Sequence, residues 1–423
     1  MTFKDIVKGV FTYNTAAVVT LRIIIGAVFI YSGFVKAIDP WGFLFKISDY
    51  LTVWHTEIPR SIILVGAIAL SAYEFLFGSL LLLGCFKRWA PIMLSTSMVV
   101  MLPLTLYTWI ANPVEDCGCF GDALKLSNAA TFFKNVVITI GLIYLVKNNS
   151  SLKKGVFHPS AQWIVCSISL LYITSIALLG YNVQPLIDYR PYPVGTNLYT
   201  TLTDTPDNES GLTFIYKKDG RTEEFGINNL PDSTWAFVER IEPASIPNES
   251  AFSIYNEDGE EIYPDEVISD EGEQLILVLP EPARADISYT YAINEFESAI
   301  TAQGGSMICL TASGKRGIDI WKDLSMAEYP CYTVDDTSLK ALVRGTPSLV
   351  YLRDGIIGWK RTVSSFDFDK ITKIGRREIA LKDAVYPDTN LLIILTAIAF
   401  GGLALSWLCQ TIATIIRHRK NIG

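Results

Sequence analysis

Histidine and charge are what this 423-residue sequence has least of. It contains three histidines, His55, His158 and His418, which lie far apart without ligand-type neighbours, so no metal site is expected. Charged residues make up 18% of the chain against 50% hydrophobic ones, too few for an ordinary soluble enzyme. A glycine-rich nucleotide-binding loop is missing as well. These absences argue against a histidine-dependent metal enzyme, an ordinary soluble enzyme and a nucleotide-binding enzyme. They indicate a membrane protein.

Long apolar runs are present instead and predict a membrane all-α protein. The runs that are long enough to span a bilayer are 18–38, 58–83, 91–110, 129–146, 160–181 and 391–416. The first run is too long for a removable signal peptide and lacks a small-residue cleavage site. Residues 41–54 mix apolar, charged and aromatic side chains, so we expect a segment at the membrane surface there.

Basic residues in the loops indicate the orientation. They gather on one side of the predicted spans, at Lys4, Lys8, Lys87, Arg88, Lys147, Lys153, Lys154, Arg417, Arg419 and Lys420. The positive-inside rule then predicts that both termini are cytoplasmic, in a multi-pass protein of a bacterial inner membrane. The large polar block between the fifth and sixth spans is expected in the periplasm.

The polar block is acidic. Residues 183–389 contain 35 acidic and 19 basic side chains, which argues against nucleic-acid binding, and solubility alone explains the acidity. The proline-rich stretch 185–196 is either a stiff arm or an ordinary linker. The segments that we expect are a four-helix membrane domain, a fifth span, a linker with a small β-rich extension, an α/β periplasmic domain and a sixth span, at 1–150, 158–182, 183–271, 272–385 and 390–416.

One pair of cysteines lies at the predicted membrane surface. Cys117 and Cys119 are separated by one glycine in a polar turn between the third and fourth spans. A direct disulfide would be strained and therefore labile, which favours redox chemistry, with a local brace as the other interpretation. Asp116 and Asp122 flank the pair and Lys125 is the only cation close in sequence, so little help toward a thiolate is expected.

Charged residues also lie within the predicted spans. Arg22 and Lys36 share one face of the first span with Gly26 and Gly33, and Glu74 lies in the second span. Small residues let helices approach closely, and the charges would be costly against lipid. In antiparallel helices Arg22 and Glu74 would both lie in the cytoplasmic half and pair. The group is then either a structural ion pair or a polar pocket for a quinone or a proton.

Together these residues resemble the DoxX/MauE family of four-helix membrane proteins over about residues 15–147. The resemblance rests on a charged first-helix pattern, a glutamate in the next helix and a cysteine turn, namely Leu21-Arg22-Ile23, Gly26, Phe29-Ile30-Tyr31-Ser32-Gly33, Lys36, Asp39-Pro40, Glu74 and Cys117-Gly118-Cys119-Phe120-Gly121. It implies thiol and sulfur redox chemistry. DoxX is linked to a quinone-dependent thiosulfate oxidoreductase, and MauE to methylamine utilisation and disulfide maturation. The redox cysteines that this resemblance implies are Cys117 and Cys119.

The second part of the polar block alternates strands and helices. Residues 275–279 and 306–311 are expected as strands, and 289–302 and 318–324 as helices, which predicts a parallel α/β core. Before it, about residues 197–270 carry turn signals at 218–220 and 257–259 between short alternating segments, which indicates the β-rich extension.

The end of the polar block resembles the C-terminal half of a thioredoxin fold, closest to TlpA-like thioredoxins, over about residues 272–375. Thr346-Pro347 opens a strand and Asp354-Gly355 forms a hairpin. The resemblance implies a cis bond before Pro347 and a partner-binding loop at Thr346 and Pro347. Where that family has Cys-x-x-Cys, residues 280–286 contain no cysteine, so a binding or scaffolding module is favoured over a redox enzyme.

The remaining cysteines have plainer interpretations. Cys309 and Cys331 fall on neighbouring predicted strands and are either a structural disulfide or two separate buried thiols. Cys85, Cys166 and Cys409 are expected as small buried apolar residues.

Two functional hypotheses follow from the sequence. The first is a membrane thiol-disulfide oxidoreductase or maturation factor, in which Cys117 and Cys119 take electrons from a periplasmic protein thiol and pass them to a quinone near Arg22, Lys36 and Glu74. The second is a non-enzymatic envelope scaffold that binds a partner through the Pro347 loop. Either protein would sit in the lipid bilayer.

Overall fold

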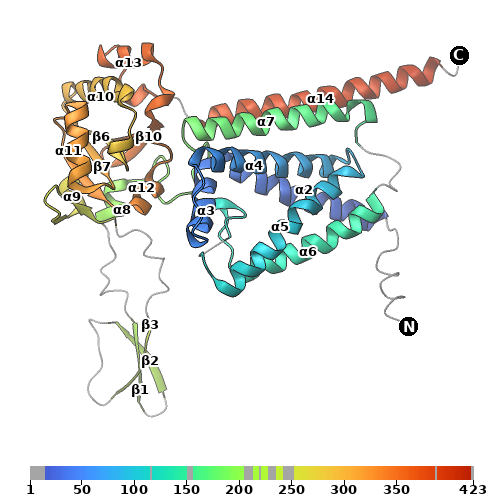
Figure 1. The fold of residues 1–423 in the computed structure, drawn as a ribbon, viewed down its shortest axis with the longest axis horizontal. Coiled ribbons are helices and arrows are strands. Elements are labelled where there is room, and N and C mark those ends of the chain that lie inside the picture. Colours follow the sequence, from blue (N-terminus) through green and yellow to red (C-terminus); the bar gives the residue numbers. More distant parts are fainter. Residues whose placement is uncertain are drawn as a thin grey trace. The chain divides into compact units, whose positions relative to one another are not determined.

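The structure is a computed structural model that describes residues 15–114, 117–149, 156–203, 213–218, 221–226, 235–241, 252–385 and 388–420. The chain separates into two compact units (Figure 1). Unit 1 comprises Met1–Tyr189 and Pro387–Gly423, and unit 2 comprises Arg190–Tyr386.

Within its described residues, unit 1 contains six helices that are long and apolar enough to cross a membrane, which confirms the predicted number of spans. They are α2 (Thr15–Ile38), α4 (Arg60–Leu83), α5 (Trp89–Ala111), α6 (Asn128–Asn148), α7 (Gln162–Asn182) and α14 (Asp388–Lys420). The predicted surface segment is a separate helix, α3 (Pro40–Val53). Asp39 ends the first span and caps α3, because its carboxylate accepts a hydrogen bond from the Gly42 amide at 2.8 Å.

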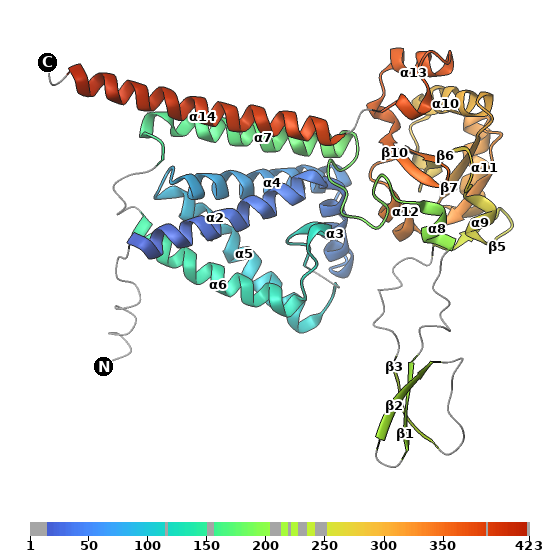
Figure 2. The same cartoon turned by 180° about the vertical axis from the view of Figure 1, so that it is seen from behind.

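Helices α2 and α4 pack closely because small residues line their contact, as the sequence predicts. A Cβ atom at Gly33 would lie 2.5 Å from the Phe75 amide nitrogen, and one at Gly26 would lie 2.8 Å from Leu82 Cβ. Helix α14 lies beside α7, and the Tyr172 and Thr396 hydroxyls join the two helices at 3.0 Å (Figures 1 and 2).

Unit 2 is built on a seven-stranded sheet of order β10-β9-β6-β7-β8-β4-β5. The strands are β4 (Ile254–Tyr255), β5 (Glu261–Ile262), β6 (Glu273–Val278), β7 (Ser306–Thr311), β8 (Cys331–Val334), β9 (Ser348–Arg353) and β10 (Ile356–Thr362). The expected parallel pairing holds for β6, β7 and β8 alone. The parallel core predicted from residues 275–279 and 306–311 is confirmed, and the β9–β10 hairpin is the one predicted at Asp354-Gly355. The other pairs are antiparallel too, so the sheet as a whole is mixed.

Helices cover both faces of this sheet. Helices α10 (Thr290–Ala302), α11 (Gly314–Ser325) and α13 (Phe368–Gly375) close one core, and α8 (Leu198–Thr203) and α12 (Asp336–Leu342) close the other. Burial on both faces explains why β6 reads as a nearly continuous apolar run. A short helix, α9 (Pro264–Val267), precedes β6. The result is the expected thioredoxin-like fold.

The expected β-rich extension divides into two parts. Strands β1 (Thr213–Lys218), β2 (Arg221–Gly226) and β3 (Ala236–Ile241) form a separate antiparallel sheet, and residues 219 and 220 of the predicted turn lie outside the described residues. The β4–β5 hairpin turns at the predicted 257–259 but pairs with β8, so it completes the sheet of the thioredoxin-like fold. Strand pairing at a sheet edge is non-local, and turn signals alone do not reveal it.

Candidate functional site

The cysteine turn between α5 and α6 packs against α2 and α3. Gly118 adopts a left-handed φ of +69°, which side chains other than glycine rarely adopt, and a Cβ there would also lie 3.1 Å from Lys46 Cγ. After Phe120 the chain enters the short helix η1 (Gly121–Ala123). The glycine therefore turns the chain so that both flanking cysteines face the same side.

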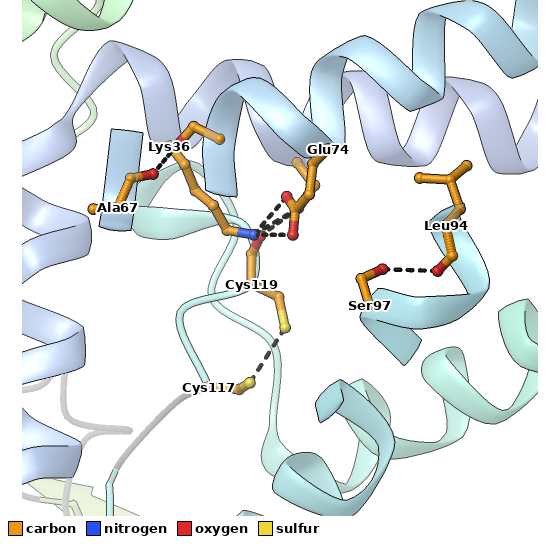
Figure 3. Close-up of polar contacts among 9 residues, drawn as sticks. Lys36, Ala67, Glu74, Leu94, Ser97, Cys117 and Cys119 are labelled. Atoms are coloured by element: carbon orange, nitrogen blue, oxygen red, sulfur yellow. Dashed lines mark hydrogen bonds and ion pairs between the residues drawn. The ribbon is translucent and has the colours of Figure 1, made fainter. Parts of the chain in front are cut away.

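Both cysteines are free thiols, and their sulfurs lie 3.2 Å apart (Figure 3). A disulfide requires about 2.05 Å, so the sulfurs would have to approach by roughly 1 Å to form one. Cys117 is 7% exposed, and Cys119 is more exposed than Cys117. The turn therefore holds the two sulfurs close to the distance at which a disulfide forms.

The electrostatics of the two thiols differ. A hydrogen bond from Cys117 lowers the pKa of Cys119 below its ordinary value, burial opposes this change, and the charges of Lys134 and Lys36 assist it. The same hydrogen bond, together with burial, raises the pKa of Cys117, although the neighbouring Tyr50 hydroxyl counteracts the rise. Of the two sulfurs, Cys119 is the one that holds a thiolate.

This result overturns one expectation from the sequence. Lys125 was the only cation close in sequence, and little help toward a thiolate was expected. Lys134, from the second turn of α6, and Lys36, from the end of α2, supply positive charge instead. Lys134 Nζ also lies 4.1 Å from the centroid of the Phe120 ring, next to Cys119 in the chain. Sequence distance concealed both lysines because the helices, and not the turn, position them.

A buried polar group lies directly beneath the turn. Lys36 Nζ lies 2.8 and 2.7 Å from the two carboxylate oxygens of Glu74, and each residue is 3% exposed (Figure 3). Lys36 also donates to Ser32 Oγ at 3.1 Å. The Ser32 hydroxyl is within 2.8 Å of Glu74 Oε2 and 2.9 Å of the Cys119 carbonyl oxygen. Ser32, which the sequence did not single out for this role, thus links the ion pair to the cysteine turn.

Arg22 does not belong to this group. It lies 14 residues before Lys36 on α2, about 21 Å along the helix at 1.5 Å per residue. Its guanidinium packs against Gly84 at the end of α4, and its Nε is buried with no hydrogen-bond partner among the described residues. The expected pairing of Arg22 with Glu74 was wrong, because Glu74 lies opposite Lys36.

The candidate loop of unit 2 has the expected backbone but no thiols. The Thr346–Pro347 bond is cis, as predicted. Val278 pairs with Ser348, so Pro347 lies next to the end of β6, where the chain continues into η5 (Pro282–Arg284). In thioredoxins that position carries the reactive cysteines. The loop thus has the backbone of a thioredoxin-like loop and cannot exchange thiols at this place.

The remaining cysteines are all free thiols. Cys309 and Cys331 are buried, Cys85 is buried, and Cys166 is half-buried. Cys409 is exposed on α14, so the expectation of burial was wrong there. Its helix is a candidate membrane span with little buried surface, and a small apolar thiol suits such an environment equally well.

Comparison with known proteins assigns the membrane part. Residues 14–147 match a family described as methylamine utilisation protein MauE. The membrane domain is of MauE type. This MauE-type domain covers about a third of the chain, includes the cysteine turn and extends from α2 to α6. Residues 212–243, which contain β1 to β3, match a second family described as a domain of unknown function (DUF8463).

Comparison with whole proteins adds little. No curated protein matches the chain. A putative protein disulfide isomerase from Bacteroides thetaiotaomicron is 12% identical, with 31% of this chain and 86% of that chain covered and a TM-score of 0.25. Bacterioferritin comigratory protein from Xanthomonas campestris is also 12% identical, with 35% and 91% covered and a TM-score of 0.22. The thioredoxin-like fold of unit 2 is established by its own strand order and cis-proline loop.

Proposed function

We propose that the protein is a membrane thiol-disulfide oxidoreductase whose working pair is Cys117 and Cys119. The observation that carries the proposal is the pair itself, two sulfurs 3.2 Å apart in a turn outside the spans, with Lys36 acting on both sulfurs and Lys134 acting on Cys119. A merely structural pair would gain nothing from the positive charge of Lys134 at Cys119. The MauE-type domain supports the same role.

The asymmetry of the pair assigns the two sulfurs different steps. In the oxidised form, a thiolate of a substrate protein attacks Cys119 Sγ, and Cys117 leaves and takes up a proton. A second thiolate of the substrate protein then attacks the substrate sulfur of the mixed disulfide and releases Cys119 as a thiolate. The substrate gains a disulfide, and the pair gains two electrons as a dithiol. We place this exchange in the periplasm, on the side that the loop charges predict.

A quinone is the proposed acceptor for these electrons, but the three residues expected to bind it do not form one site. Arg22 lies about 21 Å along α2 from Lys36. Lys36 and Glu74 satisfy each other, with Ser32 as a third partner, and leave no orphaned polar atom for a quinone carbonyl. We therefore assign no quinone site to these residues.

The test is the redox state of the pair in native membranes. Thiols are alkylated before and after reduction with two isotopic forms of one reagent, with and without added quinone or quinol. Trypsin leaves both cysteines in one peptide, 89–125, so a dithiol is recognised by two copies of the first isotopic form and a disulfide by two copies of the second form. We expect the pair to follow the quinone pool and to oxidise a reduced substrate protein, and Cys117→Ser with Cys119→Ser to abolish both effects. A pair that stays in one state under every condition would contradict the proposal.

A second candidate function is supported by unit 2. The loop at Pro347 keeps the cis bond of a thioredoxin-like binding loop, whereas residues 280–286 lack cysteine. In this alternative the protein is a non-enzymatic envelope scaffold that holds a partner at Thr346 and Pro347. If removal of residues 197–385 releases a co-purifying protein and the two serine replacements do not affect capture or growth, the scaffold is favoured over the oxidoreductase.

A role in methylamine utilisation belongs to the same proposal. The description of the matching family supports it, and the substrate would then be a periplasmic protein that acquires disulfides during maturation. Accumulation of that substrate in its reduced form in the double serine variant is the expected sign.

A further inference from the structure

Unit 2 contains a second cysteine pair. Cys309 and Cys331 are direct partners in the register between β7 and β8, which run parallel. Neighbouring strands lie about 4.8 Å apart, within the Cα separation that disulfides allow, roughly 4.4–6.8 Å. Both side chains point into the same core, where the two thiols hydrogen-bond each other. The sheet thus brings together two thiols that lie 22 positions apart in sequence.

The surroundings of this pair are not those of inert core cysteines. Cys331 Sγ lies 3.8 Å from the Tyr329 carbonyl oxygen, and the charge of Lys322 on α11 acts on both sulfurs. The hydrogen bond from Cys309 lowers the pKa of Cys331 against the effect of burial, and the same bond together with burial raises the pKa of Cys309. A purely apolar pocket would raise the pKa of both thiols.

Helix α11 covers the pair. Cys309 is 1% exposed and Cys331 is 2% exposed, and Trp321 of α11 belongs to the same core. Lys322, the next residue of the helix, forms an ion pair with Glu257 in the β4–β5 turn. This ion pair is half-exposed and therefore weak, so it can break and let α11 move away from the sheet.

We propose that Cys309 and Cys331 form a second redox pair, a cross-strand disulfide in the oxidised state and a hydrogen-bonded dithiol in the reduced state, with α11 as its cover. Oxidation proceeds by exchange with a small disulfide when α11 opens locally. The Cys331 thiolate attacks the disulfide and releases one thiolate. The Cys309 thiol then loses its proton and displaces the second thiolate. The two cysteines lose two electrons, and the small disulfide is reduced to two thiols.

The proposal is independent of the function assigned to the turn, and the experiment keeps the two apart. The full chain in detergent, with Cys117→Ala and Cys119→Ala, is reduced, freed of reductant and incubated with oxidised glutathione. Remaining thiols are alkylated at intervals before trypsin digestion. Cys309 lies in peptide 285–315 and Cys331 in peptide 323–340, so their disulfide appears as a linked pair of peptides that reductant separates.

We expect the linked pair to accumulate in the folded protein, and Cys309→Ala in the same background to abolish it. Glu257→Gln should speed its formation about two- to fivefold, the range in which the loss of a half-exposed ion pair falls. The same oxidant is also applied to the protein in urea. If Cys309 and Cys331 link fully in urea but both remain free thiols in the folded protein, the redox pair is refuted. An unchanged rate in Glu257→Gln would overturn the assignment of α11 as the cover.

Discussion

Cys119 and Cys117 are two positions apart in the chain but have different surroundings. Lys36 acts on both cysteines, whereas Lys134 acts on Cys119 and the Tyr50 hydroxyl acts on Cys117. A thiol-disulfide exchanger needs one sulfur that ionises readily and a second that resolves the mixed disulfide. Because the two roles follow from position, they can be tested one residue at a time.

Lys134→Gln should reduce the reactivity of Cys119 at neutral pH. Lys134 lowers the pKa of Cys119, so its removal raises that pKa, by roughly 0.5–1 unit, and leaves less thiolate at pH 7. We expect alkylation of Cys119 to slow about three- to tenfold at pH 7 and to be unchanged above about pH 10, where the Cys119 thiol is ionised in both proteins. The measurement is the pH dependence of the alkylation rate, resolved by fragmentation of peptide 89–125.

Lys147→Gln is the matched control, since Lys147 lies at the other end of α6. It removes the same charge from the same helix and should leave the pH midpoint of Cys119 in place. A midpoint that moves equally in both variants would mean that net charge, and not the position of Lys134, sets the reactivity.

Gly118→Ala should separate the two sulfurs. A side chain at φ +69° is strained by about 1–2 kcal/mol, and the new methyl group meets the Lys46 stem as well. The turn then relaxes, and we expect slower disulfide formation between Cys117 and Cys119 on mild oxidation. Gly66→Ala, where nothing lies within 4 Å of the new Cβ, is the control and should behave like the wild type. Equal oxidation rates in all three proteins would show that the turn does not hold the pair.

At the level of helices, Lys36 and Glu74 join α2 to α4. Glu74→Gln leaves the Lys36 charge buried without its counter-charge, which typically costs about 3–5 kcal/mol. We therefore expect a clearly lower thermal unfolding temperature in detergent. Replacing both residues, as Lys36→Met with Glu74→Leu, should restore most of the stability, because two apolar side chains need no partner.

The same double variant distinguishes structure from function at this ion pair. If Lys36 and Glu74 serve only to fix the packing of α2 and α4, thiol exchange at Cys119 should recover along with stability. If exchange stays impaired in a protein that is again stable, the pair contributes to the chemistry of the turn, through the Lys36 charge or through Ser32.

The sequence predicts these elements well where the signal is local. Apolar run length is sufficient for the six spans, and Gly26 and Gly33 are sufficient for the contact of α2 with α4. Thr346-Pro347 and the Asp354-Gly355 turn are likewise local, and both φ values of the turn are positive as such hairpins require.

The sequence does not predict contacts that depend on how one helix or strand is shifted relative to another. The choice of Lys36 over Arg22 as the partner of Glu74 depends on how far α4 is shifted along α2, and no residue pattern within either helix encodes that shift. Lys134 comes to Cys119 from another helix. The β4–β5 hairpin reaches β8 across more than 70 residues of chain, so its pairing is equally invisible to local rules.

For the whole molecule, the two units have separate apolar cores. The two core clusters of unit 2 draw only on residues between Tyr192 and Val385, and the two of unit 1 draw only on membrane helices and the chain directly next to them. Where each unit buries its own side chains, neither needs the other to fold. The proposed roles of unit 1 in exchange and of unit 2 in binding can accordingly be studied apart.

We therefore predict that residues 190–386, produced alone without the membrane helices, fold into a soluble domain. Its sheet is covered on both faces from within the unit, and its buried Lys360 amine is satisfied inside the unit by the carbonyl oxygens of Tyr192 and Leu342. Circular dichroism should show a single cooperative thermal transition. A fragment that starts at residue 197 lacks Tyr192, whose carbonyl oxygen accepts a hydrogen bond from Lys360 and whose side chain belongs to one core. This fragment should have a lower transition temperature. A fragment 190–386 that aggregates or melts without cooperativity would show that unit 2 depends on the membrane unit, and the linker could then no longer be treated as the boundary between two independent domains.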